Sequence, residues 1–206
     1  MTNESVRARR DRQRAQSLVE FAISSTVLLL LAMGLIDLSR AFYYSVNLQG
    51  AAREGARHGA WFATAARDNP YLDNADVMTA VVQALSGAGF NMTCSAGQCT
   101  STQVTFVNPG SCLSPTDGNS VTNKPYPQSA YPSTPQTANV YICYTSPGGV
   151  QSSSIASHPT DNSWKLGDIN VSILMDFQLI TPFIQGIFGN GIDLAYNEHF
   201  TIQGKP

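Results

Sequence analysis

Charged side chains are scarce in this sequence of 206 residues, because Asp, Glu, Lys and Arg together make up only 13% of it. Outside the N-terminal arm, no stretch combines clustered basic residues with interleaved aromatic residues, which argues against nucleic-acid binding. No glycine-rich phosphate loop follows a predicted strand, and no serine lies in a nucleophile-elbow pattern. The three histidines have no carboxylates near them at a recognisable spacing. The sequence therefore predicts a protein that is not an enzyme and binds no cofactor.

Only one hydrophobic run is long enough to cross a membrane. Residues 21–36 (FAISSTVLLLLAMGLI) carry no charge, and with Leu18 and Val19 they reach about the length that a bilayer requires. Five arginines lie just upstream, between residues 7 and 14. By the positive-inside rule, this basic arm stays in the cytoplasm and the part after the run is exported. We expect a single-pass membrane protein that has the lipid bilayer as a partner and an extracytoplasmic head.

A single charge, Glu20, interrupts the start of this run. A cleaved secretory signal would have a shorter apolar core followed by small residues, whereas this run continues into Asp37 and further helix-forming sequence. A plain signal anchor explains the length and the basic flank but leaves Glu20 unexplained. A carboxylate in a membrane helix is costly and usually has a partner, so Glu20 is a candidate functional residue.

Helical sequence continues well beyond the apolar run. Residues 37–66 contain no proline and many alanines, so we expect one long helix that ends before Asn69-Pro70. Its outer half carries small residues, including Gly55 and Gly59, which allow another element to approach closely. We favour packing against the protein's own head over a contact with another subunit. The charged residues of this part, from Asp37 to Arg57, are expected to be mostly solvated.

The remaining sequence predicts one more long helix and then strands. Apolar residues recur at helical spacing over residues 77–85, with Asp73 or Asn74 as the N-cap and Gly87 as the stop. Alternating patterns predict strands at residues 103–107, 139–144, 168–179 and 192–196, with a short helix at 182–188. Helices followed by strands favour an α+β fold, with an antiparallel sheet packed on the long helix.

Two polar loops interrupt the strands. Residues 108–137 are rich in Ser, Thr, Asn and Pro and show no periodicity, so we expect a mostly exposed loop. Tyr126 and Tyr131 lie among its prolines, either as an adhesive surface or, as we favour, as loop filler. Residues 146–163 have the same character.

These patterns divide the chain into three parts: a basic arm at 1–15, the helix at 16–68 and the head at 69–206.

Four cysteines lie in the predicted extracytoplasmic part: Cys94, Cys99, Cys112 and Cys143. An even number in an oxidising compartment is typical of disulfides. Metal binding is the alternative, but the nearest pair is spaced Cys-x4-Cys and the histidines are scattered, so we expect no metal site. Of the three possible pairings we favour Cys94–Cys99, which closes a short turn, and Cys112–Cys143, which ties the proline-rich loop to the sheet.

The run QSLVEFA, the apolar stretch after it and then DLSRAFYYSVNLQGAAREGARHGA resemble the N-terminal segment of the TadE-like family. This family comprises pilin-like proteins of tight-adherence (Flp) pilus systems, and the resemblance covers residues 16–60. It implies that a prepilin peptidase cuts between Ala15 and Gln16, where the family usually has Gly in place of Ala15. It also implies that Glu20, the fifth mature residue, docks one subunit on the next.

From this resemblance we expect a structural minor pilin or pseudopilin that takes part in the assembly or initiation of a tight-adherence pilus. Its partners would then be other pilin-like subunits, the pilus assembly machinery and a prepilin peptidase, and it would lie in the cell membrane or in an extracellular pilus. The alternative is a signal-anchored extracytoplasmic enzyme or ligand-binding protein unrelated to pili. A pocket with clustered titratable groups in the head would favour that alternative.

Overall fold

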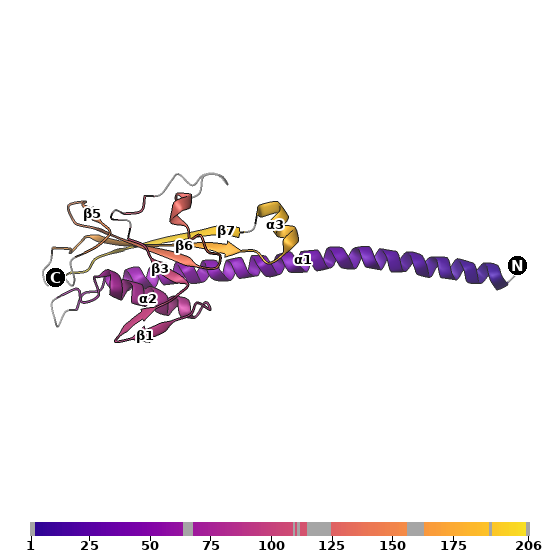
Figure 1. Cartoon of the computed structure of the whole chain (residues 1–206), viewed down its shortest axis with the longest axis horizontal. Coiled ribbons are helices and arrows are strands. Elements are labelled where there is room, and N and C mark those ends of the chain that lie inside the picture. Colours follow the sequence, from indigo (N-terminus) through magenta and orange to yellow (C-terminus); the bar gives the residue numbers. More distant parts are fainter. Residues whose placement is uncertain are drawn as a thin grey trace.

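One helix runs through the whole molecule. In the computed structural model, α1 spans Asn3–Gly59, which corresponds to roughly 85 Å at the standard rise per residue. Its N-terminal half projects alone, while its C-terminal half packs along a head formed by the rest of the chain (Figure 1). The structure describes residues 3–63, 68–108, 110, 112–114, 125–155, 163–189 and 191–204, apart from the side chains of residues 3–15, 183, 187 and 188.

The long helix ends earlier than the sequence predicts. We expected it to continue to about residue 66, but α1 ends at Gly59. The N–H of Ala60 still donates to the carbonyl of Ala56, but the N–H of Trp61 donates to the carbonyl of His58 at 3.3 Å, three residues back, and not to that of Arg57. The carbonyl of Ala60 accepts the backbone N–H of Gln203 at 3.0 Å. The side-chain amide of Asn69 donates to the carbonyls of Trp61 and Gln203. These contacts with distant parts of the chain replace the helical ladder, so the helix stops although its local sequence favours continuation.

The second helix has the predicted position and caps. α2 spans Asn74–Ser86, and the side chain of Asp73 accepts a hydrogen bond from the backbone N–H of Asp76 at 2.7 Å. Gly87 is the C-cap residue. The predicted apolar stripe faces the core, where Val77, Val81 and Leu85 are fully buried. Because α2 packs against α1, these two helices form one layer of the head.

Small residues of α1 allow this close packing, which is the arrangement that we favoured over a subunit contact. Ala52 and Ala56 are fully buried in the main core. A Cβ atom at Gly55 would lie 2.4 Å from Val81 Cγ2, and one at Gly59 would lie 2.6 Å from Val77 Cγ2. The two helices therefore touch where α1 has no side chain.

Alanine substitutions at Gly55 and Gly50 are expected to separate the effect of helix–helix packing on stability from the effect of helix propensity. Gly55→Ala should lower the free energy of unfolding by about 1 kcal/mol or more, because overpacking of about 1–3 kcal/mol outweighs a helix-propensity gain of about 0.5–1 kcal/mol. Gly50→Ala, at a helical position with nothing within 4 Å of the added Cβ, should raise it by that gain. Denaturant unfolding in detergent measures both. Equal effects of the two variants would show that α1 and α2 do not pack as described.

The main sheet has the strand order β3-β4-β6-β7, with β5 paired to β4. The strands are β3 Val104–Phe106, β4 Ala138–Thr145, β5 Gln151–Ser152, β6 Asp168–Gln178 and β7 Gly191–Thr201. β6 pairs antiparallel with both β4 and β7, in agreement with the antiparallel sheet that we predicted. β3, however, pairs parallel with β4, so the sheet is mixed rather than purely antiparallel. A long connection between β3 and β4 brings the chain back to the same end of the sheet, which a parallel pair requires.

Three short elements complete the described fold. A hairpin of β1 (Thr93–Ser95) and β2 (Gln98–Thr100) lies beside α2 and was not predicted as strands. A single 3-10 turn, η1, spans Gln128–Ala130. The short helix α3 spans Pro182–Phe188, as predicted, with Pro182 at its first position. We also expected Thr181 to cap it, and Thr181 is the N-cap residue, but its side chain makes no capping hydrogen bond. α3 connects β6 to β7 at the end of the head that faces the projecting part of α1 (Figure 1).

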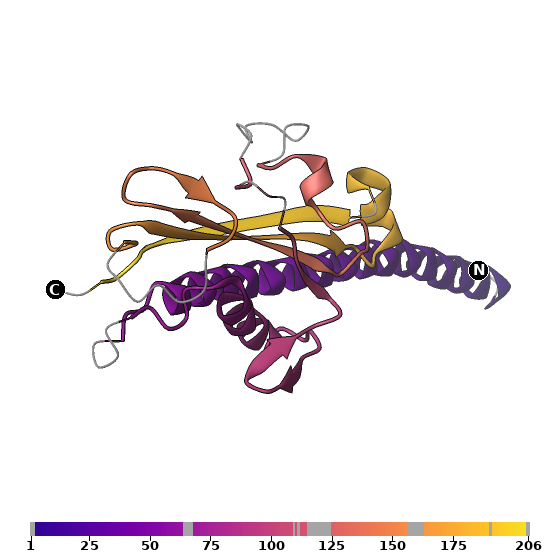
Figure 2. The same ribbon diagram turned by 60° about the vertical axis from the view of Figure 1, so that its left-hand side comes forward.

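The sheet has a core on each face, which Figure 2 shows as helices on one side and the η1 segment on the other. The main core lies between the sheet and the helices α1 and α2, and it includes the alternating face of β6 from Ile169 to Phe177. The second core is smaller and contains Tyr126, Ala130, Tyr131, Tyr141 and Leu174. The architecture is therefore α+β, with a mixed sheet packed on the long helix.

Candidate membrane anchor and docking site

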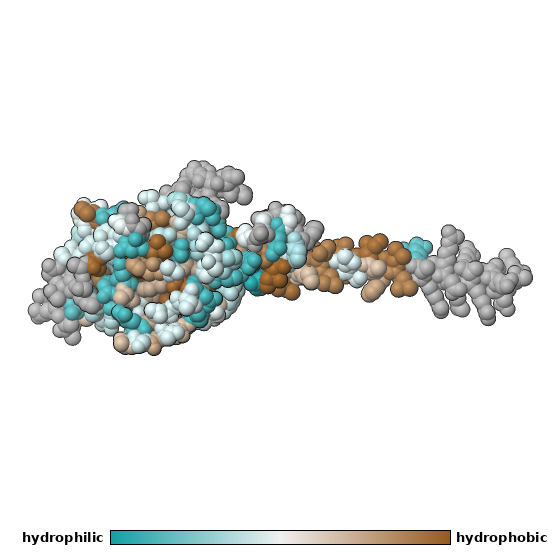
Figure 3. All heavy atoms as spheres, in the orientation of Figure 1, coloured by the Kyte–Doolittle hydropathy of each residue, from teal (hydrophilic) through white to brown (hydrophobic). Residues whose placement is uncertain are grey.

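The projecting part of α1 is an apolar rod. Its large side chains are exposed over the whole segment before the head, and Figure 3 shows this stretch in brown between the head and the N-terminal arm. Within the described residues, Gln16–Gly59 is the helical segment long and apolar enough to cross a membrane. Apolar side chains at this density are costly in water, so this segment favours a lipid environment or a protein partner.

The structure brings Gln16 and Glu20 together at the start of this rod. The side-chain amide of Gln16 donates to Glu20 Oε1 at 3.1 Å, one helical turn away, and both side chains are exposed. The side chain of Ala15 lies outside the described residues. Glu20 therefore accepts one hydrogen bond within its own chain, and its exposed carboxylate remains accessible to a second partner.

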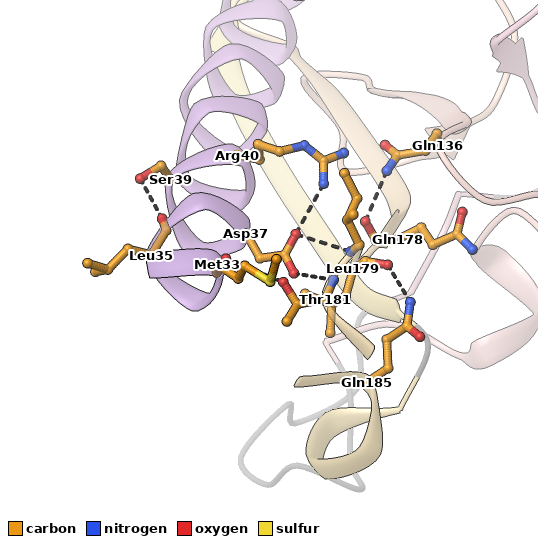
Figure 4. A network of polar contacts seen from close by, with 11 residues as sticks. Met33, Leu35, Asp37, Ser39, Arg40, Gln136, Gln178, Leu179, Thr181 and Gln185 are labelled. Atoms are coloured by element: carbon orange, nitrogen blue, oxygen red, sulfur yellow. Dashed lines mark hydrogen bonds and ion pairs between the residues drawn. The ribbon is translucent and has the colours of Figure 1, made fainter. Parts of the chain in front are cut away.

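Asp37 forms the junction between the rod and the head, which the sequence did not predict. We expected the charges of this part of the helix to be mostly solvated, but Asp37 is only 2% exposed. Its two carboxylate oxygens accept the backbone N–H groups of Ile180 and Thr181, at 3.1 and 2.8 Å (Figure 4). These donors belong to the loop between β6 and α3, so one side chain of α1 holds that loop against the helix.

Arg40 completes the junction from one turn further along α1. Its guanidinium lies 3.2 Å from Asp37 Oδ1 and 5.1 Å from the centroid of the Phe177 ring. The ion pair compensates the buried carboxylate, and the ring contact adds a cation–π interaction. The other described pair on α1, Glu54–Arg57, is exposed as predicted. Burial thus distinguishes Asp37 from an ordinary surface charge.

Further contacts hold the β6–α3 loop to the apolar part of α1 and hold α3 to that loop. The Thr181 hydroxyl donates to the carbonyl of Met33 at 3.3 Å, and the Gln185 amide donates to the carbonyl of Leu179 at 2.6 Å. A Cβ atom at Gly34 would lie 3.2 Å from Ile184 Cδ1, so the glycine lets α3 approach the helix. In this junction, hydrogen bonds or an ion pair therefore engage the side chains of Asp37, Arg40, Thr181 and Gln185.

An apolar groove of about 610 Å³ lies between α1 and α3. Asp37 is the one ionisable residue of its lining, and both of its oxygens are engaged as described above. The rest of the lining is aliphatic and comes from three elements and one loop: Val27, Leu30, Leu31, Gly34, Leu35, Leu38 and Ala41 of α1, Leu179 after β6, Ile184 of α3 and Ile192 of β7. The groove is continuous with the exposed apolar surface of the rod.

The structure contains two disulfides, Cys94–Cys99 and Cys112–Cys143, which is the pairing that we favoured from the sequence. The first joins β1 to β2 across their hairpin, with a Cα–Cα distance of 4.1 Å. The second joins the proline-rich loop to β4, with a sequence separation of 31. By the chain-entropy model, a loop of that length stabilises the fold by about 3 to 4 kcal/mol. This bridge lies on the face of β4 opposite to the α1 layer.

The two tyrosines of the proline-rich loop form neither an exposed surface nor loop filler. Tyr126 and Tyr131 are each only 5% exposed and belong to the second core. Asn197 of β7 donates to the Tyr126 hydroxyl at 3.1 Å, and burial raises the pKa of Tyr131 to about 12. Their rings cover the sheet around Tyr141 and Leu174. The described end of the loop is therefore a structural part of the head.

Among the described residues, no group of three or more His, Cys, Asp or Glu is arranged to hold a metal ion. A polar hollow of about 620 Å³ lies beside η1, lined by Thr, Ser, Gln and Asn side chains together with Tyr131 and Pro132. Tyr131 is the one titratable residue in that lining. Neither this hollow nor the apolar groove combines titratable groups as an acid–base site would.

These features define the class of the protein: a single long N-terminal helix, apolar enough over its projecting part to cross a membrane, carries an α+β head. The sequence model of the TadE-like protein family matches residues 15–57, which confirms the resemblance and identifies this segment of the chain as TadE-like. The match includes Ala15, Gln16, Glu20 and Asp37 and ends two residues before the end of α1. No curated protein and no solved structure matches the chain.

Proposed function

We propose that the protein is anchored in a membrane by α1, with the N-terminal arm in the cytoplasm and the head outside. The length and exposure of the apolar rod support the anchor. The five arginines before the rod support the orientation, because basic flanks remain on the cytoplasmic side. The two disulfides are consistent with it, since such bonds persist in extracytoplasmic compartments.

In this position the protein acts as a minor pilin or pseudopilin that helps to assemble or initiate a tight-adherence pilus. The observation that carries this proposal is the TadE-like match over residues 15–57. The matched segment contains both the Gln16–Glu20 pair and the apolar rod. A prepilin peptidase would cut between Ala15 and Gln16, and Glu20 would then dock the mature chain on other pilin-like subunits. Its role is structural rather than catalytic.

A complementation experiment tests this function. A strain of the source organism that lacks this chain is expected to lose its pili or to make far fewer, because initiation of assembly fails. Expression of the full chain should restore them, whereas expression of the head alone, residues 60–206, should not. Electron microscopy and the amount of sheared pilin in the medium measure the result. Normal piliation without the chain would refute a role in assembly or initiation.

A further inference from the structure

The position of α3 along α1 indicates how deep the head lies in the membrane. The uncharged run from Leu18 to Ile36, interrupted only by Glu20, has 19 residues and a length of roughly 28 Å, close to the hydrocarbon thickness of a bilayer. The whole run is therefore needed to cross the membrane. Yet α3 contacts α1 at Gly34, inside this run, and the groove beside α3 extends down to Val27. This end of the head must then lie at the depth of the hydrocarbon.

The polar groups of this end suit such an environment, where unpaired backbone groups are costly. Asp37 accepts the N–H groups of Ile180 and Thr181, and Gln185 donates to the carbonyl of Leu179. The sequence of α3, PFIQGIF, contains no charged residue. Ile180 is 64% exposed next to the groove, which is unfavourable in water but favourable in lipid.

We propose that α3 is embedded in the leaflet on the head's side and that the groove between α3 and α1 holds an acyl chain of a phospholipid. This inference rests on the membrane anchoring proposed above. An acyl chain fits the aliphatic lining, and the groove opens onto the rod surface that already faces lipid. Tyr43, which follows the run on α1 and is exposed, then lies at the level of the headgroups, where tyrosine is preferred on both sides of a membrane.

Photo-crosslinking in a bilayer tests this placement. The full chain, reconstituted in phosphatidylcholine nanodiscs, carries the photoreactive residue p-benzoylphenylalanine at one of three exposed positions. Ile192 lines the groove, Leu28 faces outward from the rod, and Val150 lies in the turn between β4 and β5 at the far end of the head. Mass spectrometry should find phospholipid adducts at Ile192 and at Leu28, and none at Val150.

Other crosslinking results would contradict either the embedding of α3 or the membrane anchor. A phospholipid adduct at Leu28 but not at Ile192 would leave the anchor standing and overturn the embedding of α3. An adduct between Ile192 and a second copy of the chain would show that the groove is an interface between subunits and would also overturn it. No phospholipid adduct at Leu28 would refute the membrane anchor itself, and this inference with it.

A groove-filling variant tests the acyl chain separately from the depth of the head. Gly34→Leu places a side chain between α1 and α3, whereas Gly50→Leu adds one at a position with open space around it. Gly34→Leu should strongly reduce the phospholipid adduct at Ile192 and leave that at Leu28 unchanged. Gly50→Leu should leave both unchanged. An Ile192 adduct that is unaffected by Gly34→Leu would show that no acyl chain enters the groove.

Discussion

Replacing Glu20 by alanine is expected to abolish co-purification with pilus subunits and piliation, while leaving the protein inserted and its head folded. Glu20 lies in the N-terminal half of α1, which projects from the head (Figure 1), and its hydrogen bond in the described part of the chain is with Gln16 of the same helix. In the docking role that the TadE-like resemblance implies, its carboxylate meets the N-terminal amine of a neighbouring subunit. Such a pair in a medium of low dielectric contributes several kcal/mol at most after desolvation. Affinity purification and electron microscopy measure the loss.

The bond between Gln16 and Glu20 supplies the matched control. Gln16→Ala removes the partner within the chain but keeps the carboxylate. Once N-terminal sequencing has shown that this variant is still cut before residue 16, it should assemble normally, because an exposed side-chain pair on a helix contributes only about 0.2–0.5 kcal/mol. Glu20→Gln keeps the size of the side chain but removes its charge, and it should fail as Glu20→Ala does. Wild-type piliation with Glu20→Gln would mean that Glu20 merely caps the helix start, and the docking role would have to be abandoned.

The second large effect is expected at Asp37. Asp37→Ala leaves the N–H groups of Ile180 and Thr181 without their acceptor, and each buried unpaired group costs about 1–3 kcal/mol. We expect the free energy of unfolding to fall by about 3 kcal/mol. For a chain of this size, that corresponds to a melting temperature lower by roughly 6–12 °C. Near-UV circular dichroism of the protein in detergent, followed with temperature, measures the change.

Arg40→Ala is the control for this measurement. Arg40 is 29% exposed and its contacts are an ion pair and a ring face, so its loss should cost only about 1 kcal/mol. Asp37→Asn, which keeps one carbonyl oxygen, should lie between the two. If Asp37→Ala destabilises the head no more than Arg40→Ala, the carboxylate does not hold the β6–α3 loop, and the described junction is wrong.

Elements with a strong local signal were predicted well from the sequence. The alternation of β6 and the caps of α2 depend on neighbouring residues, and both elements formed as expected. The end of α1 was misplaced because it is decided by Asn69 and Gln203, which bond to the turn after the helix. Local propensity carries no information about such partners.

The junction at Asp37 was missed for the same reason. An acid followed three residues later by an arginine is the ordinary pattern of a solvated helix pair. Its burial depends on backbone groups more than 140 positions away. One signal was present, since Asp37 is the first charge after the apolar run and Thr181-Pro182 opens a helix without charge. The buried tyrosines of the proline-rich loop had no such signal, because that loop has no periodicity.

The N-terminal sequence of the protein, taken from its native membrane, tests the pilin-like account most directly. With the cognate prepilin peptidase present, the account predicts that the chain begins at Gln16 and that Ala15→Gly is cut at least as well. Cleavage there creates the amine that Glu20 is proposed to meet on a neighbouring subunit. A chain that keeps Arg7 to Arg14 whatever peptidase is supplied would be a permanent anchor, and the pseudopilin function would be contradicted.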